Sequence, residues 1–426
     1  MFCYQCSQTP PAGCTKRGVC GKNEDIASLQ DTLIFGLKGI SAYAYHAREL
    51  GYADPEVDSF LYEALFSTLT NVNFDLQRWI KLVLRCGEMS LKTMALLDRA
   101  HTEKFGDPQP TAVSTGTREG PGILISGHDL LDLYELLKQT EGKGISVYTN
   151  GEMLPAHAYP ELKKFPHLAG NWGGSWIKQK DDFDAFPGAI LATTNCVLIP
   201  KESYKDRLFT CGVAGVEGVT HIENRDFTPV IDKALSLPRL PEQPGRTITT
   251  GFHHKAVLAL ADKIIAAIKA GKIRHFFLVG GCDSPYKTHP YYREFAQLVP
   301  EDCVILTLAC GKYRFNDLDF GAIDGIPRLL DIGQCNNAYS AIQIAAALAD
   351  AFRCPVNDLP LTLVVSWFEQ KAVAILLTLL HLGIKRIYLG PRPPAFLTPN
   401  VLKALQETYY LRLIDNPQGD LAQMVG

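Results

Sequence analysis

Four cysteines near the amino-terminal end have a spacing that indicates metal chemistry. Cys3, Cys6, Cys14 and Cys20 follow the pattern C-x2-C-x7-C-x5-C among prolines and glycines. So short a segment cannot bury a core of its own, so thiolates converging on an iron–sulfur cluster or a zinc ion would hold it together. Zinc sites usually pair two C-x2-C-like halves across a longer run, which is missing. We therefore predict a four-cysteine iron–sulfur cluster, with zinc or disulfides as the alternatives.

A second set of metal-competent side chains follows the predicted strands. Eight β-branched or apolar runs predict strands at 122–126, 145–149, 189–194, 275–279, 303–308, 328–332, 361–366 and 386–390. One histidine, two glutamates and four cysteines come just past seven of them: His128, Glu152, Cys196, Cys282, Cys310, Cys335 and Glu369. Open α/β sheets bind ligands in the crevice at the carboxyl ends of their strands. We therefore predict that these seven side chains form one site.

The chemical types in this set indicate what it would bind. A single cysteine after a strand is more often a small buried hydrophobe, and a lone histidine or glutamate usually makes loop hydrogen bonds. Seven such residues, each just past a different strand, are much harder to explain by chance. Thiolates suit iron–sulfur iron, whereas carboxylates and imidazole suit harder iron bridged by oxygen. A centre held by all seven would be partly an iron–sulfur cluster and partly a non-haem iron site with a vacant position.

The elements that must position these residues are of two kinds. Apolar periodicity predicts a bundle of about three helices, over 26–50, 55–70 and 73–105. From Gly120 onward, strands alternate with helical stretches at 129–140, 255–271, 339–352 and 370–383, which implies parallel sheets with right-handed crossovers. A proline-rich stretch at 235–246 separates two such units.

The predicted fold class is multidomain, α followed by α/β. Its parts are an iron–sulfur loop at 1–24, a helical bundle at 25–110, and two doubly wound parallel, Rossmann-like α/β domains at 111–245 and 246–426. The remaining cysteines, Cys86, Cys211, Cys303 and Cys354, are interpreted as structural.

Composition narrows the function classes. The net charge of −3 argues against nucleic acid or an anionic membrane surface as a partner. No apolar run is long enough to span a bilayer, and the cysteine motif leaves no room for a signal peptide before it. We therefore expect a cytoplasmic chain whose 12 cysteines stay reduced. No phosphate-binding or dinucleotide-binding glycine motif occurs, so nucleotide binding and direct NAD oxidation are not indicated.

Several longer motifs resemble a known family, the hybrid cluster proteins, also called prismane proteins or hydroxylamine reductases. The matching segments are CYQC with GVCGK, LQDTLIFGLKGI, SGHDLLDL, YTNGEMLPAHAYPELKKFPHLAGNWGG, TTNC, HFFLVGGCD, LTLACGKYRF, DIGQCNNAYSAIQIA and SWFEQKAVAILLTLL. They cover nearly the whole chain. By motif, Cys3, Cys6, Cys14 and Cys20 resemble the ligands of the family's amino-terminal cubane, a [4Fe-4S] cluster. The seven strand-end residues resemble the ligands of its hybrid [4Fe-2O-2S] cluster.

The resemblance implies an activity. Electrons from a protein donor, a ferredoxin-like protein or a reductase, would enter at the [4Fe-4S] cluster. The hybrid cluster would reduce a small nitrogen oxide species: hydroxylamine to ammonia and water, or nitric oxide to nitrous oxide. Substrate would bind near Glu152, His128 and Glu369, and Cys282 matches the cysteine that relatives can carry as a persulfide. Lys371 and His157 are candidates for charge stabilisation or proton delivery, or else they only support the ligands.

Two other functions stay open at this point. One is a carbon monoxide dehydrogenase, whose architecture the family shares; its nickel site needs other ligands, and Glu152 and Glu369 argue against it. The other is a nitric oxide or redox sensor that passes nitroso groups to partner thiols through Cys282. Iron without nickel would exclude the first, and steady-state turnover would exclude the second.

The chain is shorter than the long members of the family. Barely 40 residues separate Cys86 from His128, where longer members carry a second helical bundle, so the chain resembles a shortened class found in anaerobes. The α/β surface that this bundle covers must be covered otherwise. We therefore expect a two-fold homodimer, with residues 25–105 contributing to the contact.

Overall fold

Three long helices begin the chain after the cysteine loop. The structure, a computed structural model, describes residues 3–284 and 290–425. Helices α1 (Glu24–Glu49), α2 (Pro55–Ser67) and α3 (Leu76–Phe105) match the predicted ones closely. Each begins where an Asn or Asp side chain accepts a backbone N–H of the first turn, at Asn23, Asp54 and Asp75.

A fourth helix, distant in sequence, completes this bundle. Helix α13 (Gln370–His381) lies in the last part of the chain, yet it packs against both α1 and α3. The approach is close because Gly87 has no side chain: a Cβ there would lie 2.0 Å from the carbonyl oxygen of Leu377. The prediction of about three helices therefore missed one, since periodicity does not show which distant helix shares a core.

The first α/β unit is a six-stranded parallel sheet in the order β4-β3-β2-β5-β6-β7. Its strands are β2 (Gly122–Ser126), β3 (Ser146–Asn150), β4 (Leu168–Asn171), β5 (Ala189–Ala192), β6 (Leu208–Cys211) and β7 (Thr220–Ile222). The accompanying helices are α4 (Leu130–Thr140), α5 (Pro160–Lys163), α6 (Gln179–Ala185), α7 (Glu202–Lys205) and α8 (Thr228–Ser236). The three central strands are fully or almost fully buried, as expected of a sheet with both faces covered.

The second unit repeats this architecture with the order β13-β10-β9-β14-β15-β16. Its strands are β9 (His275–Gly281), β10 (Cys303–Leu308), β13 (Leu329–Gly333), β14 (Leu361–Ser366), β15 (Ile387–Gly390) and β16 (Arg412–Leu413). Its helices, besides α13, are α9 (His254–Leu258), α10 (Ala261–Lys269), α11 (Tyr291–Leu298), α12 (Ala338–Phe352), α14 (Pro399–Tyr409) and α15 (Pro417–Val425). The stretch predicted as one helix over 255–271 is thus two helices.

Short antiparallel pairs complete the fold. Strand β1 (Thr111–Ser114) pairs with β8 (Thr247–Thr250), and β11 (Ala322–Ile323) pairs with β12 (Ile326–Pro327). The β1–β8 pair joins the two predicted α/β domains across the proline-rich stretch. All eight predicted strands are present within a residue or two, and those missed have only two to four residues.

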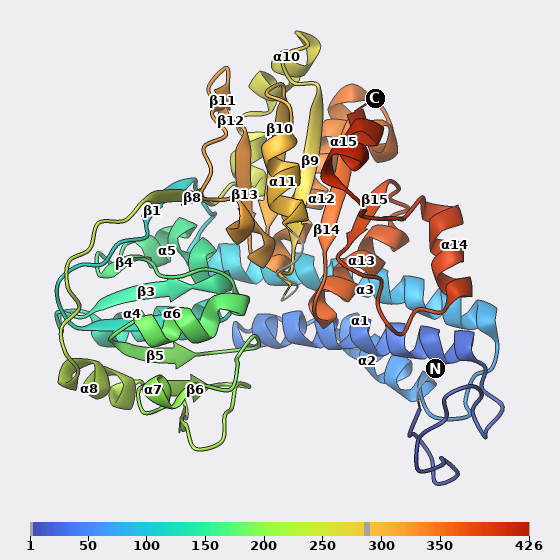
Figure 1. Cartoon of the computed structure of the whole chain (residues 1–426), viewed down its shortest axis with the longest axis horizontal. Helices are drawn as coiled ribbons and strands as arrows, with labels where there is room; N and C mark the ends of the chain where they lie inside the picture. Colours follow the sequence, from blue (N-terminus) through green and yellow to red (C-terminus); the bar gives the residue numbers. More distant parts are fainter. Residues whose placement is uncertain (1–2, 285–289, 426) are drawn as a thin grey trace.

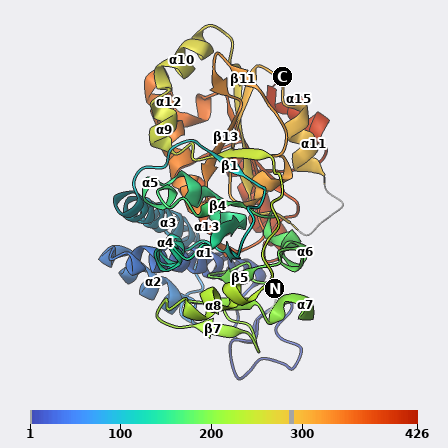
Figure 2. The same cartoon turned by 90° about the vertical axis from the view of Figure 1, so that its left-hand side faces the viewer.

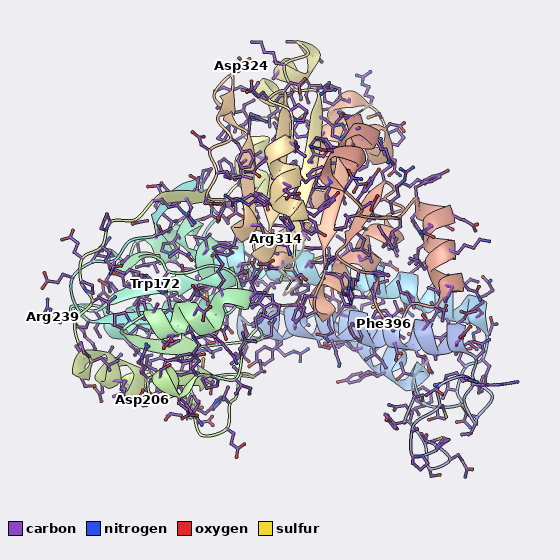
Figure 3. All side chains as sticks on the ribbon, in the orientation of Figure 1. Trp172, Asp206, Arg239, Arg314, Asp324 and Phe396 are labelled. Atoms are coloured by element: carbon purple, nitrogen blue, oxygen red, sulfur yellow. The ribbon has the colours of Figure 1, made fainter. Side chains whose placement is uncertain are left out.

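The three parts meet at the carboxyl ends of the strands. In Figure 1 the first sheet lies at the left and the second at the top, while α1 and α3 run below the second sheet and to the right of the first. Figure 2 shows the same arrangement from the side, with the cysteine loop at the bottom. Arg314, labelled near the centre of Figure 3, lies where the parts converge. Among the described residues, no helix is long and apolar enough to cross a membrane.

Candidate metal centre

All seven predicted donors line one cavity between the two sheets. His128, Glu152 and Cys196 follow β2, β3 and β5, which are neighbours in the first sheet. The other four follow β9, β10, β13 and β14, which are neighbours in the second: Cys282, Cys310, Cys335 and Glu369. Among the described residues, Trp176, Ala309 and Phe368 complete the lining. The predicted juxtaposition of the seven side chains is therefore present in the structure.

His128 is held with one ring nitrogen free to face the cavity. The Thr194 hydroxyl oxygen lies 2.9 Å from both the backbone nitrogen and Nδ1 of His128. An Nδ1–H donated to this oxygen leaves the Nε2 lone pair available to a metal. Burial lowers the pKa of His128 well below its usual value, so the imidazole is neutral, the form that binds metals. Nε2 lies 4.0 Å from Oε2 of Glu152.

The two carboxylate oxygens of Glu152 differ in their contacts. Its Oε2 accepts the backbone N–H of Cys335 at 2.9 Å, which ties the first α/β unit to the second. Its buried Oε1 has no hydrogen-bond partner among the residues that the structure describes. Burial raises the pKa of Glu152, so a carboxylate here gains by bonding a cation. One donor atom each from His128, Glu152 and Cys335 lies within 4.8 Å of the other two.

The four thiols are buried enough to resist ionisation on their own. Burial raises the pKa of Cys335 to about 11 and that of Cys196 to about 12. It raises those of Cys282 and Cys310 well above the usual value. Such thiols become thiolates only beside strong positive charge, which iron supplies. The orphaned carboxylate oxygen and the four thiols fit an iron–sulfur–oxygen cluster.

Unusual backbone conformations aim two of these cysteines. Cys196 itself has φ of 69°, and Ala309, just before Cys310, has φ of 62°. Left-handed conformations cost free energy in residues other than glycine and are concentrated at functional sites. Before Cys282, Gly281 has φ of 102°, and a Cβ there would lie 2.1 Å from the carbonyl oxygen of Ser366. The turns after these strands are therefore built to present sulfur to the cavity.

Glu369 forms the last part of the wall, and Lys371 lies close behind it. Oε2 of Glu369 accepts the backbone N–H of Lys371 at 3.1 Å and so caps α13. The buried Lys371 ammonium donates to Oδ1 of Asn195 at 2.9 Å and lies 3.9 Å from Oε1 of Glu369. Burial lowers the pKa of Lys371, but Cys335, Glu369, Cys196 and Glu152 outweigh it, and the net pKa is raised. Lys371 thus offsets part of the donors' negative charge.

Two aromatic rings close the outer side of the cavity. Trp176 and Phe368 lie with ring centroids 4.1 Å apart, and Phe368 is 44% exposed. The Trp176 indole N–H donates to the carbonyl oxygen of Asp283 at 3.3 Å, and Arg314 holds the Asp283 carboxylate at 2.6 Å. A small molecule entering from solvent on this side would pass these rings.

The amino-terminal cysteines lie elsewhere, beyond the far end of the bundle. Cys3 and Cys14 face each other through two backbone hydrogen bonds of 3.2 and 3.0 Å. A hydrogen bond from Thr9 is the main cause that lowers the pKa of Cys6. In the described part of the chain, only two groups of three donors lie within 4.8 Å, and neither includes these cysteines. The backbone thus brings two of the four together; their role as ligands stays a prediction.

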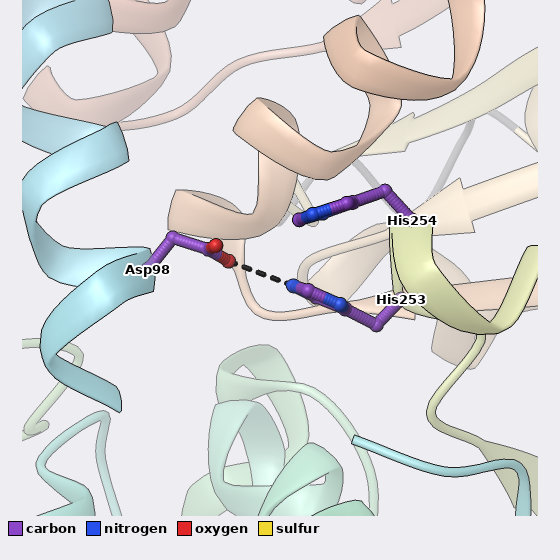
Figure 4. Close-up of side chains that lie close together, drawn as sticks. All are labelled: Asp98, His253 and His254. Carbon is purple, nitrogen blue, oxygen red and sulfur yellow. Dashed lines mark hydrogen bonds and ion pairs between the residues drawn. The ribbon is translucent and has the colours of Figure 1, made fainter. Parts of the chain in front are cut away.

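The other donor group was missed by sequence reasoning. Asp98 on α3 lies beside His253 and His254, just before and at the start of α9, as Figure 4 shows. Nε2 of His253 is 2.8 Å from Oδ1 of Asp98, and the two imidazole rings lie 3.9 Å apart. The consecutive histidines were a visible signal, but no strand end or motif drew attention to them. The pair ties α3 to the second α/β unit.

Two further sequence predictions concern nearby residues. His157 is buried with Nε2 3.0 Å from the Thr149 hydroxyl, and it does not line the cavity of the seven donors. Nothing in its contacts supports a role in proton delivery. Cys86, Cys211 and Cys303 are buried among apolar residues and Cys354 is partly buried, as expected of structural cysteines.

Comparison with known proteins agrees with this architecture. The model of the Prismane/CO dehydrogenase family matches residues 1–81 and 75–422. A hydroxylamine reductase of Moorella thermoacetica is 71% identical, with all of both chains covered. One of Thermotoga maritima is 56% identical over 100% of this chain and 99% of the relative. The 45% match to that of Geobacter sulfurreducens extends over 547 positions, so this relative carries segments without a counterpart here.

Solved structures agree in fold alone. Carbon monoxide dehydrogenase IV of Carboxydothermus hydrogenoformans superposes with a TM-score of 0.81 at 16% identity, covering 100% of this chain and 91% of the other. The nickel-free enzyme of Thermococcus sp. AM4 gives 0.78 at 17%, covering 99% and 89%. The chain belongs to the Prismane/CO dehydrogenase family and is an iron–sulfur oxidoreductase. Within that family it is a hybrid cluster protein.

Proposed function

We propose that this protein reduces hydroxylamine to ammonia and water at a hybrid [4Fe-2O-2S] cluster. The observation that carries the proposal is the cavity lined by four thiols, two carboxylates and one imidazole, each just past a different strand. The relatives that match over the full chain are hydroxylamine reductases. His128, Glu152, Cys196, Cys282, Cys310, Cys335 and Glu369 would hold the cluster. When bound, it supplies electrons and an exchangeable iron position.

The protein's own residues would set the geometry of binding. The hard donors His128, Glu152 and Glu369 mark the side where a nitrogen–oxygen substrate would bind. Lys371 places one positive charge near the two carboxylates, with its Nζ 3.9 Å from Oε1 of Glu369. Trp176 and Phe368 exclude bulk water from the outer side. Cys282 would carry the persulfide that the family resemblance implies.

Electrons would enter at the amino-terminal cysteine loop, which lies away from the interior metal centre. Cys3, Cys6, Cys14 and Cys20 would hold a [4Fe-4S] cluster that takes electrons from a ferredoxin-like donor or a reductase in the cytoplasm. The loop is more exposed than the interior centre: one of its four cysteines is buried, against two of the four interior ones, and Tyr4 and Val19 beside its cysteines are exposed. Exposure suits contact with a donor protein, and burial suits chemistry that must exclude water.

A homodimer contact is proposed beside this loop. Helix α2 and the turn after it expose large apolar side chains: Tyr62, Leu65, Phe66, Leu69, Val72 and Phe74. This apolar patch adjoins the loop, since the Thr70 hydroxyl donates to the carbonyl oxygen of Gln5 at 3.0 Å. Contiguous exposed patches of this kind normally mark an interface. Anaerobic light scattering should show twice the chain mass of 47.0 kDa; the monomer mass at micromolar concentration would contradict the dimer.

One anaerobic experiment tests the activity. Purified protein should contain iron without nickel, show paramagnetic resonance signals of two distinct centres on reduction, and form ammonia from hydroxylamine with a reduced viologen dye. Nickel together with carbon monoxide oxidation would replace the proposal by a dehydrogenase. A single stoichiometric reaction without steady turnover would favour a sensor.

A further inference from the structure

A second, smaller cavity lies behind the metal centre, on the side of the helical bundle. Its wall includes two of the proposed ligands, His128 and Cys335, and the Lys371 ammonium side chain. The remaining lining comes mainly from α1, α3 and the segment around Cys335: Tyr43, His46, Leu97, His101, Gln334 and Asn336. We call this space the rear chamber. It has room for about one water molecule.

The rear chamber is lined by polar side chains that could bond a water molecule. Among the described residues, Nδ1 of His101 and Nδ2 of Asn336 are buried without a hydrogen-bond partner. The Tyr43 hydroxyl hydrogen-bonds the Cys335 thiol, and its oxygen keeps a lone pair that can accept from water. All three side chains line the chamber and are buried. Buried polar groups are normally satisfied, and an unsatisfied set around a small space indicates ordered water. Three potential partners are what one buried water typically uses.

A graded path of charged groups leads from the chamber to solvent. Nδ1 of His46 lies 3.3 Å from Oδ2 of Asp129, and the two side chains are 12% and 7% exposed. Arg225 approaches Asp129 at 3.9 Å and Glu49 at 3.0 Å, with 28% and 33% of these two outer side chains exposed. The titratable groups facing His46 from neighbouring elements are thus Asp129, His101 and His128, with Asp132, Arg225 and Glu49 beyond them. Of the three histidines that line the rear chamber, His46 is the most exposed.

We propose that the rear chamber holds a water molecule through which protons reach the metal centre, and that His46 passes them in from the surface. This rests on the proposed function. Reduction of hydroxylamine breaks its N–O bond and consumes two electrons and two protons, giving NH3 and H2O. The electrons come from the protein or dye donor. The protons must cross a buried wall, and the chamber is the polar space in contact with His128 and Cys335 on the side away from Trp176 and Phe368.

His46 acts through the water, so it is a positioning residue for proton transfer. His46→Ala should keep wild-type iron content and KM for hydroxylamine, while kcat falls about 10- to 100-fold, the scale of a lost proton-transfer group. The solvent deuterium isotope effect on kcat should rise, and added imidazole should restore part of the rate. The matched control is His221→Ala: His221 is exposed and bonded to Thr210 at 3.0 Å, away from the chamber, and its loss should change nothing.

A structural measurement tests the water independently of turnover. A high-resolution crystal structure of the cluster-loaded protein should show a water bonded to at least two of Tyr43, His101 and Asn336, and a dry chamber would overturn the proposal. So would wild-type kcat in His46→Ala, or a lowered kcat with neither imidazole rescue nor a changed isotope effect. If the wild-type protein itself does not reduce hydroxylamine, the proposed function fails, whatever the crystal shows.

Discussion

The two cysteine-bearing regions differ in how the protein treats a thiol. In the amino-terminal loop, the hydrogen bond from Thr9 lowers the pKa of Cys6 at the surface. In the interior, burial, reinforced by nearby anionic groups such as Glu152, raises the pKa of Cys310 well above its usual value. A surface thiolate is stabilised by water and local hydrogen bonds, whereas a buried one needs a metal. The exposed loop is therefore suited to receive electrons from a donor protein. The interior thiols are suited only to hold a buried metal cluster.

The largest expected effect comes from removing one of the predicted ligands of the interior centre. Cys310→Ala should abolish occupancy of the hybrid cluster and lower hydroxylamine reduction by more than about 100-fold, beyond the loss typical of a residue that only supports a ligand. Iron should fall only by the share of that cluster. Iron analysis and paramagnetic resonance measure this, and full iron content would show that Cys310 is not a ligand.

A more conservative substitution tests the charge of a donor while keeping its size. Glu369→Gln keeps the size of the side chain but removes the carboxylate that suits a hard iron. Turnover should fall about 10- to 100-fold, with the fold unchanged by circular dichroism. Glu407→Gln, on the exposed face of α14, is the matched control and should leave turnover unchanged. Wild-type turnover in Glu369→Gln with full iron would contradict the seven-donor site.

The loop should respond differently. Cys6→Ser or Cys14→Ser should remove the [4Fe-4S] cluster and leave the hybrid cluster in place, because the two donor sets come from separate parts of the chain. Reduction with the natural protein donor should fall several-fold more than reduction with a small dye that reaches the interior. Loss of all iron in either variant would mean that the two centres are not independent.

The smallest effect concerns acid stability, which should depend on the interior and not on the loop. Burial lowers the pKa of His157 to about 4. In the unfolded chain, a histidine has its usual pKa near 6.5 and becomes protonated below that pH, whereas in the folded protein His157 stays neutral down to about pH 4. The free energy of unfolding therefore falls by up to about 3 kcal/mol as the pH falls from about 6.5 to 4. Urea unfolding of metal-free protein should show a smaller loss in His157→Gln between pH 7 and 5. An identical pH dependence in both would refute this role.

Much of the architecture follows from local pattern. The strands before His128, Cys310 and Glu369 coincide with their predicted ranges because buried parallel strands are continuous apolar runs. Because the carboxyl ends of parallel strands meet at one edge of a sheet, the position after a strand then predicts that seven residues far apart in the sequence lie together. Short edge strands such as β7, with the sequence Thr-His-Ile, were missed because they carry no such run.

What the sequence determined by itself was the kind of centre, because donor type and position after a strand are local properties. Only the tertiary structure decided how the centre is surrounded. Helix α13 packs closely against α3 because Gly87 has no side chain at the contact. This packing buries Lys371 beside Glu369, at the wall of the rear chamber. Tyr43 and His46 lie on a helix whose periodicity shows a buried face but not what faces it. Contacts between elements far apart in the chain depend on packing in three dimensions, which no local pattern encodes.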